Sequence, residues 1–388
     1  MSEDNILFNK SYIAGKELFY VADAVIKGDL KGDGSYTKKC HQWLENSLEC
    51  KKALLTHSCT AALEMSALLF DLKPGDEVLV PSYAFPSTAN AFYLRGAKIV
   101  FVDVRADTIN LDESLIEKAI TKKTKAICAL HYAGVSCEMD PIMQIAKKYN
   151  LRVVEDAAQA IFSSYKGRKC GTLGDLAAFS FHETKNLSSG EGGALIINDP
   201  AFCERSEIIR EKGTNRSKFF RGEVDKYSWV DLGSSYLPSE VLAAFLYGQL
   251  EQAENIQSAR RRIWQRYNQE LAVLQEKECF RMPIIPATCE QNFHMFYLLC
   301  RSETERDDLM YFMRENGVHA VFHYFPLHLS KMGQDFGYKE GDFAVSESIA
   351  SRIIRLPMYC SLSDQQQTKI IGLVENFYQK KVLKISNS

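Results

Sequence analysis

The sequence of 388 residues is 46% hydrophobic and 25% charged, which is typical of a globular protein with one large core or two domains. Its net charge of −2 gives no basic surplus for binding a phosphate backbone, so we expect no nucleic-acid partner. The start MSEDNILFNK does not resemble a secretory signal, and no apolar run approaches the roughly 18 to 20 residues of a membrane helix. We therefore expect a cytoplasmic protein without membrane insertion.

Short apolar, β-rich runs alternate with helix-patterned stretches between about residues 50 and 250. The runs are DEVLVPS, AKIVFVDV, KAICALHY, LRVVEDA, LAAFSF and GGALIIN. Fully apolar strands separated by helices predict an α/β fold with a parallel or mixed sheet covered on both faces. Ligands gather at the carboxyl ends of such strands, and polar residues concentrate there, in segments 82–85, 155–159 and 180–186 and at His131.

The pattern changes beyond residue 250. Apolar positions over 249–275 have the spacing of one long amphipathic helix. After it we expect strands near 293–300 and 318–325 and helices near 303–316, 342–354 and 363–379. This organisation predicts a large α/β domain over 1–250 and, over 251–388, the connecting helix with a smaller C-terminal α+β domain.

A helix that could bind phosphate is expected first along the chain. Ser58 and Thr60 precede an amphipathic stretch in THSCTAALEMSALLF. Free amides at a helix N-terminus together with hydroxyls form a phosphate site. An ordinary capping box is the alternative, because Glu64 lies in the first turn.

Asp156 follows the apolar run LRVV and is expected at the carboxyl end of a strand. A helix N-cap is the plain alternative, since residues 157–160 could open a helix.

Lys185 lies in FSFHETKNLSSGEGGALII, residues 179–197, between two runs that both predict buried strands. A lysine is usually a solvated surface residue, but this one stands beside Ser180 and His182 in a connection that returns through glycines. The glycines alone are weak evidence, because SGEGG lacks the P-loop spacing and no GxGxxG follows a strand.

One chemistry uses all three elements. A lysine amine can hold an aldehyde cofactor as a Schiff base, a carboxylate can keep the ring nitrogen protonated, and a helix N-terminus can hold the phosphate. The chain order fits, with the helix first, then Asp156, then Lys185 29 residues further on. The sequence therefore predicts pyridoxal 5′-phosphate (PLP) as the cofactor.

We expect no metal site. HAVFHYFPLH contains His319, His323 and His328, but the segment is patterned as a strand and turn, where the first two would not share a face, and there is no HExxH. The eleven cysteines include no CxxC, and several, such as Cys128 and Cys300, stand in apolar runs, which favours reduced core thiols.

Several separated segments resemble, in order, the nucleotide-sugar aminotransferases of the DegT/DnrJ/StrS group. They are PGDEVLVPSYAFPSTANA, VVEDAAQA, AFSFHETKNLSSGEGGALI, GSSYLPSE and AVFHYFPLH, and the similarity covers almost the whole chain. The resemblance implies PLP-dependent transferase fold type I, similar to aspartate aminotransferase, and a homodimer whose sites are completed by the partner chain.

The resemblance also implies roles for individual residues. Lys185 would hold the cofactor and move the proton, and Asp156 would pair with the ring nitrogen. The remaining cofactor contacts would come from Gln159 at the phenolic oxygen, Phe85 on the ring, and Cys59, Thr60 and Ser180 at the phosphate. Ser235 stands where many members have an asparagine that reaches the partner's phosphate.

For the reaction, the resemblance implies transfer of the amino group of L-glutamate to C4 of a dTDP-4-keto-6-deoxyhexose, giving dTDP-4-amino-4,6-dideoxy-D-galactose for surface polysaccharide synthesis. A different keto-sugar nucleotide, the gluco product, or a non-catalytic regulatory protein are the alternatives.

Segment 205–226 carries seven cations. An arginine fork suits a diphosphate, so we expect Arg216 or Arg221 at the dTDP diphosphate, from the same or the partner subunit. The sugar would lie near His182, His323 and Tyr324. A solvated helix face with nearby glutamates is the alternative for the cations.

Overall fold

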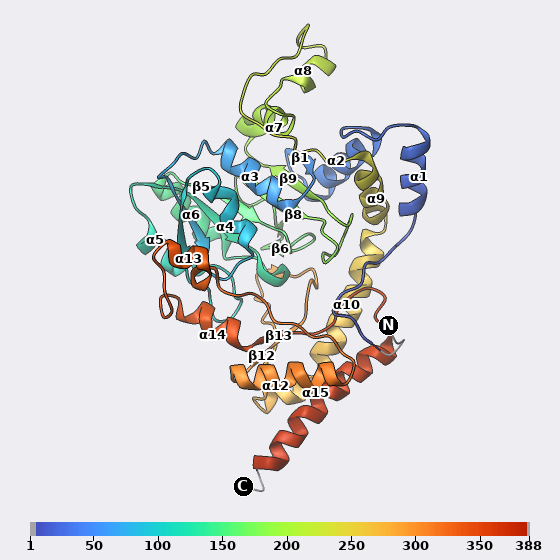
Figure 1. Ribbon diagram of the computed structural model, residues 1–388, viewed down its shortest axis with the longest axis vertical. Helices are drawn as coiled ribbons and strands as arrows, with labels where there is room; N and C mark the ends of the chain where they lie inside the picture. The colour runs from blue at the N-terminus through green and yellow to red at the C-terminus, as the bar shows by residue number, and fades with distance from the viewer. Residues whose placement is uncertain (1–4, 386–388) are drawn as a thin grey trace.

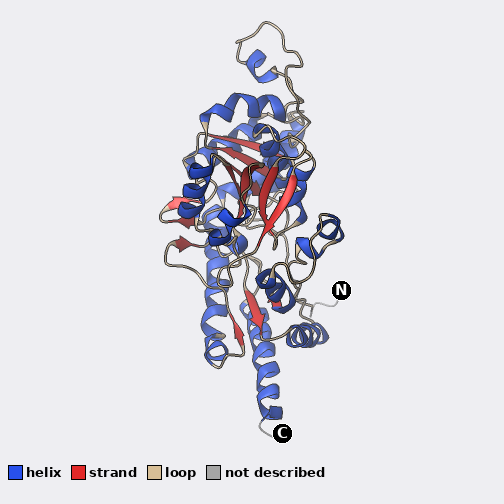
Figure 2. Cartoon of the chain, turned by 90° about the vertical axis from the view of Figure 1, so that its left-hand side faces the viewer, coloured by secondary structure: helices blue, strands red, loops and turns tan. Residues whose placement is uncertain are grey.

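The computed structural model describes residues 5–385, and its centre is a seven-stranded sheet between two layers of helices (Figure 1, Figure 2). The strands are β1 (Lys52–Thr56), β2 (Glu77–Pro81), β3 (Lys98–Val102), β4 (Thr124–Leu130), β5 (Arg152–Asp156), β8 (Leu176–Ser180) and β9 (Gly193–Ile197). Their order is β1-β9-β8-β5-β4-β2-β3, and β9 alone in this sheet runs against the others. The predicted, mostly parallel sheet is confirmed; β1 was not among the predicted strands.

Helices cover both faces of the sheet, because alternate side chains of the apolar strands point to opposite sides. Val154 and Leu176 pack on one side, the α3 face, and Val153 and Ala177 on the other. The α3 face carries α3 (Cys59–Leu69), α4 (Pro86–Tyr93) and α7 (Cys203–Arg210). The opposite face carries α2 (Ser35–Leu48), α5 (Glu113–Ala119), α6 (Met139–Tyr149) and α9 (Glu240–Glu251), with α1 (Glu17–Ile26) packed on α9.

The single helix predicted over 249–275 is wrong. The chain forms α9, then α10 (Ala253–Glu270) and α11 (Ala272–Glu276), with breaks at Gln252 and Leu271. The apolar spacing continues across the first break, and Leu250 and Ile256, on either side of it, both pack with the large sheet. Ile263, further along α10, packs with the C-terminal core. A periodic pattern cannot show that the buried face changes its partner.

The C-terminal part is a small α+β unit, as predicted. Its antiparallel sheet has the order β10 (Phe280–Arg281), β12 (Tyr297–Cys300) and β13 (Ile353–Arg355). The three predicted helices are confirmed as α12 (Glu303–Glu315), α14 (Ala344–Arg352) and α15 (Asp364–Ile385), although β13 follows α14 where helix was expected. The remaining short elements are α8 (Arg216–Phe220), α13 (Lys331–Asp335), β6 (Ser164–Tyr165), β7 (Arg168–Lys169) and β11 (Cys289–Glu290).

The strand predicted over 318–325 is also wrong. Val318 pairs with Ile6, whereas Val321 pairs with Arg355, and these are isolated bridges rather than one ladder. The two ends of the segment therefore bond to different neighbours. Beyond Val321 the chain turns toward the large sheet, where Leu327 donates its N–H to the carbonyl of Ser82 at 2.9 Å.

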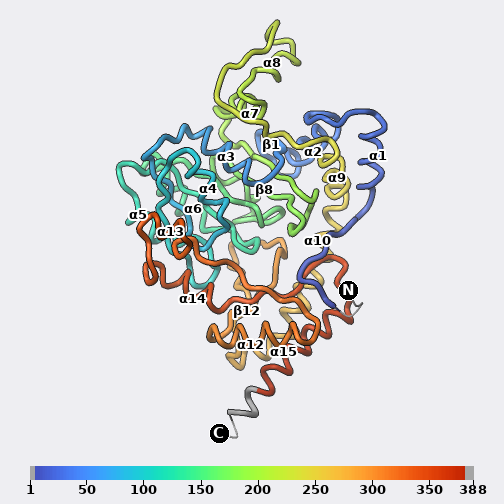
Figure 3. The backbone as a smooth tube through the Cα atoms, in the orientation of Figure 1, coloured from blue at the N-terminus to red at the C-terminus, as the bar shows by residue number. Residues whose placement is uncertain are grey.

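We propose the domain boundary near residue 250. The C-terminal core draws on residues from Ile263 to Tyr378, with one addition from the other end of the chain, Ile6. In Figure 3 the blue N-terminal tube runs down to this C-terminal part. Ile6 is 2% exposed, so the N-terminal segment is a structural member of the small unit.

The chain segment that contains α8 projects from the body of the large unit (Figure 1). It exposes large apolar side chains, including Phe220 at 67% and Trp229 at 79%. Across residues 5–385, none of the helices combines the length and apolar character needed to cross a bilayer.

Candidate active site

A cavity of about 620 Å³ opens at the carboxyl ends of the sheet strands, in the size range of small-molecule sites. It collects every predicted site residue except Arg216, Arg221 and Ser235. The predicted residues lining it are Cys59, Thr60, Phe85, Asp156, Gln159, Ser180, His182, Lys185, His323 and Tyr324.

Asp156 ends β5, and the alternation of the strand turns it toward the α3 face, on the same side as Val154. It is 3% exposed, accepts a hydrogen bond from the Thr88 hydroxyl at 2.7 Å, and accepts the Ala158 N–H at 3.2 Å. Burial raises the pKa of Asp156, while the Thr88 and Ala158 hydrogen bonds and the charge of Lys185 act in the opposite direction. A turn follows rather than a helix, so the N-cap alternative is wrong.

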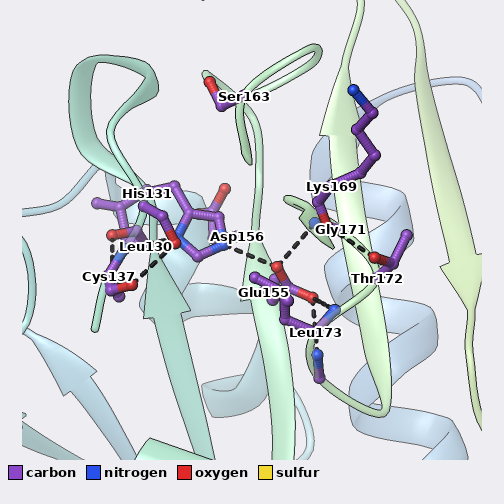
Figure 4. Close-up of polar contacts among 12 residues, drawn as sticks. Leu130, His131, Cys137, Glu155, Asp156, Ser163, Lys169, Gly171, Thr172 and Leu173 are labelled. Atoms are coloured by element: carbon purple, nitrogen blue, oxygen red, sulfur yellow. Dashed lines mark hydrogen bonds and ion pairs between the residues drawn. The ribbon is translucent and has the colours of Figure 1, made fainter. Parts of the chain in front are cut away.

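Glu155 points the other way and is satisfied by protein groups (Figure 4). Its carboxylate accepts the N–H groups of Gly171, Leu173 and Gly174 and bonds His131 Nε2 at 2.8 Å. The Cys137 N–H donates a hydrogen bond to His131 Nδ1, so the ring proton is on Nε2. This N–H therefore donates the hydrogen bond to Glu155. Of these two adjacent carboxylates, Glu155 therefore has a structural role, and Asp156 lines the cavity.

The N-terminus of α3 lies at the same cavity. Ser58 is the N-cap and accepts the Ala61 N–H at 3.1 Å, whereas the amides of Cys59 and Thr60 have no acceptor within the helix. Gly193, at the start of β9, makes the close approach possible, since a Cβ there would meet the Cys59 nitrogen at 2.4 Å. The result is an anion cradle of backbone amides.

The capping-box alternative for this helix is wrong. The third residue after Ser58 is Ala61, so Glu64 lies one turn too far along to bond back to the cap. The Thr60 hydroxyl instead bonds Ser87 Oγ at 2.8 Å at the start of α4.

Lys185 lies in the turn after β8, held by its neighbours. Its N–H donates to the His182 carbonyl at 2.9 Å, and the next residue, Asn186, donates to the Asn292 carbonyl at 2.8 Å and bonds His294 Nδ1 at 2.9 Å. Desolvation lowers the pKa of the Lys185 amine, and the charge of Arg355 lowers it further, against the opposing effects of Cys59 and Asp156. The environment thus destabilises the charged form of this amine.

Polar side chains from both parts of the chain meet across the cavity. The Gln159 amide donates to the Tyr324 hydroxyl at 3.0 Å and accepts the Ala133 N–H at 2.7 Å. His323 Nδ1 lies 3.0 Å from the Tyr132 hydroxyl, and burial lowers the pKa of His323, so it is a neutral polar group at pH 7. Side chains from before and after residue 250 therefore complete one site.

Phe85 and His182 line the cavity and remain at least partly exposed. Phe85 is 55% exposed, and its ring centroid is 6.0 Å from that of Tyr324. His182 Nδ1 bonds the Thr184 hydroxyl at 3.0 Å, and its Nε2 is 3.6 Å from Glu191. Both residues are placed where a ligand can reach them.

Arg216 and Arg221 line a different cavity of about 680 Å³, which shares no lining residue with the first. Arg216 pairs with Glu211 at 2.7 Å, and Arg221 pairs with Glu207 at 2.9 Å. Ser235 is exposed, and its backbone bridges to that of Glu211. One chain therefore does not bring these three predicted residues to Lys185.

Among the cavity residues that were not predicted from the sequence, three are placed to act on the site. Thr88 orients Asp156, His294 orients the loop of Lys185, and Arg355 lines the cavity from β13. Thr88 and His294 gave no signal, since their positions depend on which elements pack together. Arg355 ends the apolar run RIIR, which is the same polar-after-strand signal that singled out Asp156.

The donor set fits a PLP-like cofactor. The amide cradle of α3 is open to an anion, the buried Asp156 favours a cation beside it, and the amine of Lys185 is depressed in pKa within the same cavity. Fold and site together define a PLP-dependent transferase.

The family model of the DegT/DnrJ/EryC1/StrS aminotransferases matches residues 12–375, and the chain belongs to this family. PLP is the cofactor of the family, and its members are sugar aminotransferases.

Three relatives show the extent of the similarity. The GDP-perosamine synthase of Escherichia coli O157:H7 is 30% identical over 373 residues, 95% of this chain and 97% of that protein. The pleiotropic regulatory protein of Geobacillus stearothermophilus is 32% identical over 365 residues, 94% and 95% of the two chains. The PLP form of Spr1654 from Streptococcus pneumoniae has a TM-score of 0.89 at 26% identity, covering 97% of this chain and 99% of that one.

Proposed function

We propose that the protein transfers the amino group of L-glutamate to C4 of dTDP-4-keto-6-deoxyglucose, giving dTDP-4-amino-4,6-dideoxy-D-galactose in the cytoplasm, for surface polysaccharide synthesis. The observation that carries amino transfer is the amine of Lys185 sharing one cavity with buried Asp156. The choice of sugar is supported by segment 210–237, REKGTNRSKFFRGEVDKYSWVDLGSSYL, which resembles that of dTDP-4-amino-4,6-dideoxygalactose transaminases.

In this proposal each residue has a defined task. When bound, PLP supplies an aldehyde for the lysine amine and a ring that withdraws electrons from the reacting carbon. Lys185 holds the cofactor and carries a proton at Nζ to and from that carbon. Asp156 keeps a ring nitrogen protonated, and Thr88 holds the Asp156 carboxylate in position. The amides of Cys59 and Thr60, with Ser180, bind the phosphate.

Product analysis tests the function. The protein, supplied with L-glutamate and dTDP-4-keto-6-deoxyglucose, is expected to form 2-oxoglutarate and one amino sugar, whose C4 configuration NMR shows to be galacto. An equatorial C4 amine would contradict the product assignment. Turnover only with a GDP- or UDP-linked keto-sugar would contradict the choice of nucleotide.

The non-catalytic regulatory protein expected as an alternative from the sequence has a namesake in the 32% identical relative, the pleiotropic regulatory protein. A regulator has no need for a lysine of lowered pKa beside a buried carboxylate, and both are present here. Turnover in the product assay separates the two functions, because a regulator without catalysis would bind the nucleotide and release no 2-oxoglutarate.

We further propose a homodimer in which the partner subunit completes the nucleotide site. The exposed apolar residues around α8 suit a subunit contact, and Arg216 and Arg221 stand at the two ends of this helix. The guanidinium groups of Arg216 and Arg221 would then contact the dTDP diphosphate in the partner subunit's active site. Ser235 would contact the phosphate of the cofactor in that same site. Among residues 5–385 the buried Nε of Arg216 has no hydrogen-bond partner, although another nitrogen of the same group pairs with Glu211.

Replacing Arg216 and Arg221 together with alanine tests the nucleotide site. The glutamate half-reaction should stay near normal, because no diphosphate takes part, whereas the KM for the keto-sugar nucleotide should rise about tenfold or more, on the order of 1.4 kcal/mol. Stopped-flow absorption measures the first step and steady-state kinetics the second. Alanine at Arg262 and Arg314, both exposed, is the control; equal damage to both half-reactions, or to neither, would contradict the assignment.

A further inference from the structure

His328, the last histidine of HAVFHYFPLH, lies at the junction between the large sheet and the small C-terminal unit. It is 0% exposed, yet both ring nitrogens are bonded. Nδ1 lies 2.5 Å from the Ser82 hydroxyl, and Nε2 lies 2.9 Å from the Glu347 carboxylate. Ser82 directly follows β2, and Glu347 is in the first turn of α14. One side chain therefore connects the two parts of the chain.

The neighbours of His328 fix the direction of both hydrogen bonds. Burial opposes ionisation of the Glu347 carboxyl, but its hydrogen bonds from His328 and from two backbone N–H groups lower its pKa overall. An ionised carboxylate can only accept, so Nε2 carries the proton of the neutral ring and donates the hydrogen bond. Nδ1 is then an acceptor, and the Ser82 hydroxyl donates to it. We call this chain of hydrogen bonds the Ser82–His328–Glu347 relay.

The relay has the order of the Ser–His–acid triad of hydrolases, but its burial excludes that activity. Ser82 is 0% exposed and is not among the residues that line the cavity of Lys185. A nucleophile must reach its substrate, and this hydroxyl cannot. The relay therefore has a positional role.

The relay stands between two walls of the active-site cavity. On one side, Ser82 precedes Phe85 by three residues, and Phe85 lines the cavity at the start of α4. On the other side, Tyr324 precedes His328 by four residues, and its hydroxyl accepts the Gln159 amide at 3.0 Å. The ring centroids of Phe85 and Tyr324 lie 6.0 Å apart. The two walls are thus joined a few residues from the positions where they face each other.

The segment that carries Tyr324 is not part of a strand ladder. It is attached by an isolated bridge at Val321 and again at Leu327, whose N–H donates to the Ser82 carbonyl at 2.9 Å. The next residue, His328, adds its side-chain bond at the same point. The place of Tyr324 in the cavity therefore depends on this attachment.

We propose that His328 is a positioning residue for the cofactor: through the relay it sets the spacing of Phe85 and Tyr324 around the cofactor ring. This inference rests on the proposed aminotransferase function and on the expected place of Phe85 against that ring. A shift of a cavity wall by about 1 Å can lower a rate about 10²-fold, because the reacting groups no longer align.

Circular dichroism in the visible absorption band of the bound cofactor tests the proposal, because this signal depends on how the ring is held. His328→Leu fills the volume and removes both hydrogen bonds, whereas Ser82→Ala removes one. Both are expected to lower the dichroic signal per bound cofactor, and His328→Leu to slow the glutamate half-reaction about tenfold or more. Borohydride labelling of Lys185 should persist. His328→Asn, whose oxygen can accept from Ser82, should lie between His328→Leu and the wild type.

Ser346→Ala is the matched control. Ser346 is also 0% exposed, and its hydroxyl donates to Asp103 at 2.6 Å, which ties α14 to the end of β3 outside the relay. This variant should keep the wild-type dichroism and half-reaction rate, even where thermal melting shows a loss of stability like that of Ser82→Ala. An equal loss of signal in Ser346→Ala would mean that any weakening of the junction has this effect, and would overturn the proposal.

Unchanged dichroism and half-reaction rate in Ser82→Ala and His328→Leu would also overturn it. If His328→Leu does not fold, Ser82→Ala against Ser346→Ala decides. None of these measurements uses a sugar nucleotide, so failure of the proposed sugar would show separately in the product assay.

Discussion

Replacing Lys185 with alanine is expected to remove amino transfer, with kcat falling about 10⁴-fold or more, because the variant loses both the covalent attachment and the proton carrier. Borohydride reduction of the wild-type enzyme, followed by peptide mapping, should place the cofactor on Lys185. In the alanine variant the cofactor can still bind through the α3 amides, but reduction should leave it unattached. Kinetics, mass spectrometry and absorption spectra together measure these effects.

A matched control is Lys169→Ala. Lys169 lies on the short strand β7, is exposed and points away from Glu155 and Asp156 in Figure 4. It should leave turnover and labelling unchanged. A reduced cofactor on any lysine other than Lys185, with PLP bound, would overturn the assignment.

Asp156→Asn is expected to lower kcat about 10²-fold or more while the protein still binds the cofactor. Asparagine keeps the shape, and its oxygen can still accept the Thr88 hydroxyl, but it has no negative charge to keep a ring nitrogen protonated. Loss of that charge should also lower the pKa of the Lys185 amine, since Asp156 raises it. The pH dependence of cofactor capture by the cofactor-free enzyme measures this second effect.

The control for Asp156 is Thr88→Val, which removes the hydroxyl and keeps the charge. Its effect on kcat should be much smaller than that of Asp156→Asn, because the Ala158 N–H still holds the carboxylate. If Asp156→Asn turned over near the wild-type rate with the cofactor bound, the carboxylate would not have the proposed task.

The part of the cavity that follows the sheet strands could be predicted from the sequence, because its residues sit at the ends of apolar strands. Asp156, Ser180 and Lys185 follow strands that the apolar runs identify, and parallel strands bring their carboxyl ends to one edge of the sheet. Ser58 and Thr60 are predicted from a helix N-terminus, which is also a local signal, whereas Cys59 is predicted only from the family resemblance. Local patterns therefore give those parts of a site that each element carries by itself.

The sequence could not show which helices and strands contact one another. Thr88 reaches Asp156 only because α4 packs on the same face of the sheet as α3. The segment expected as a strand over 318–325 bonds to Ile6 at one end and Arg355 at the other, and neither partner is near in sequence. The apolar spacing over 249–275 likewise does not show that the buried partner changes within α10, from the large sheet at Ala253 and Ile256 to the C-terminal core at Ile263.

The N-terminal segment decides how the protein can be tagged and truncated. Ile6 is built into the C-terminal core, and Phe8 and Asn9 line the cavity of Lys185, so trimming the chain to the start of α1 would remove part of the pocket wall. A fusion joined just ahead of Ile6 would place its linker a few residues from that wall. A fusion joined after α15, which runs away from the sheet in Figure 1, is the better handle for purification or immobilisation.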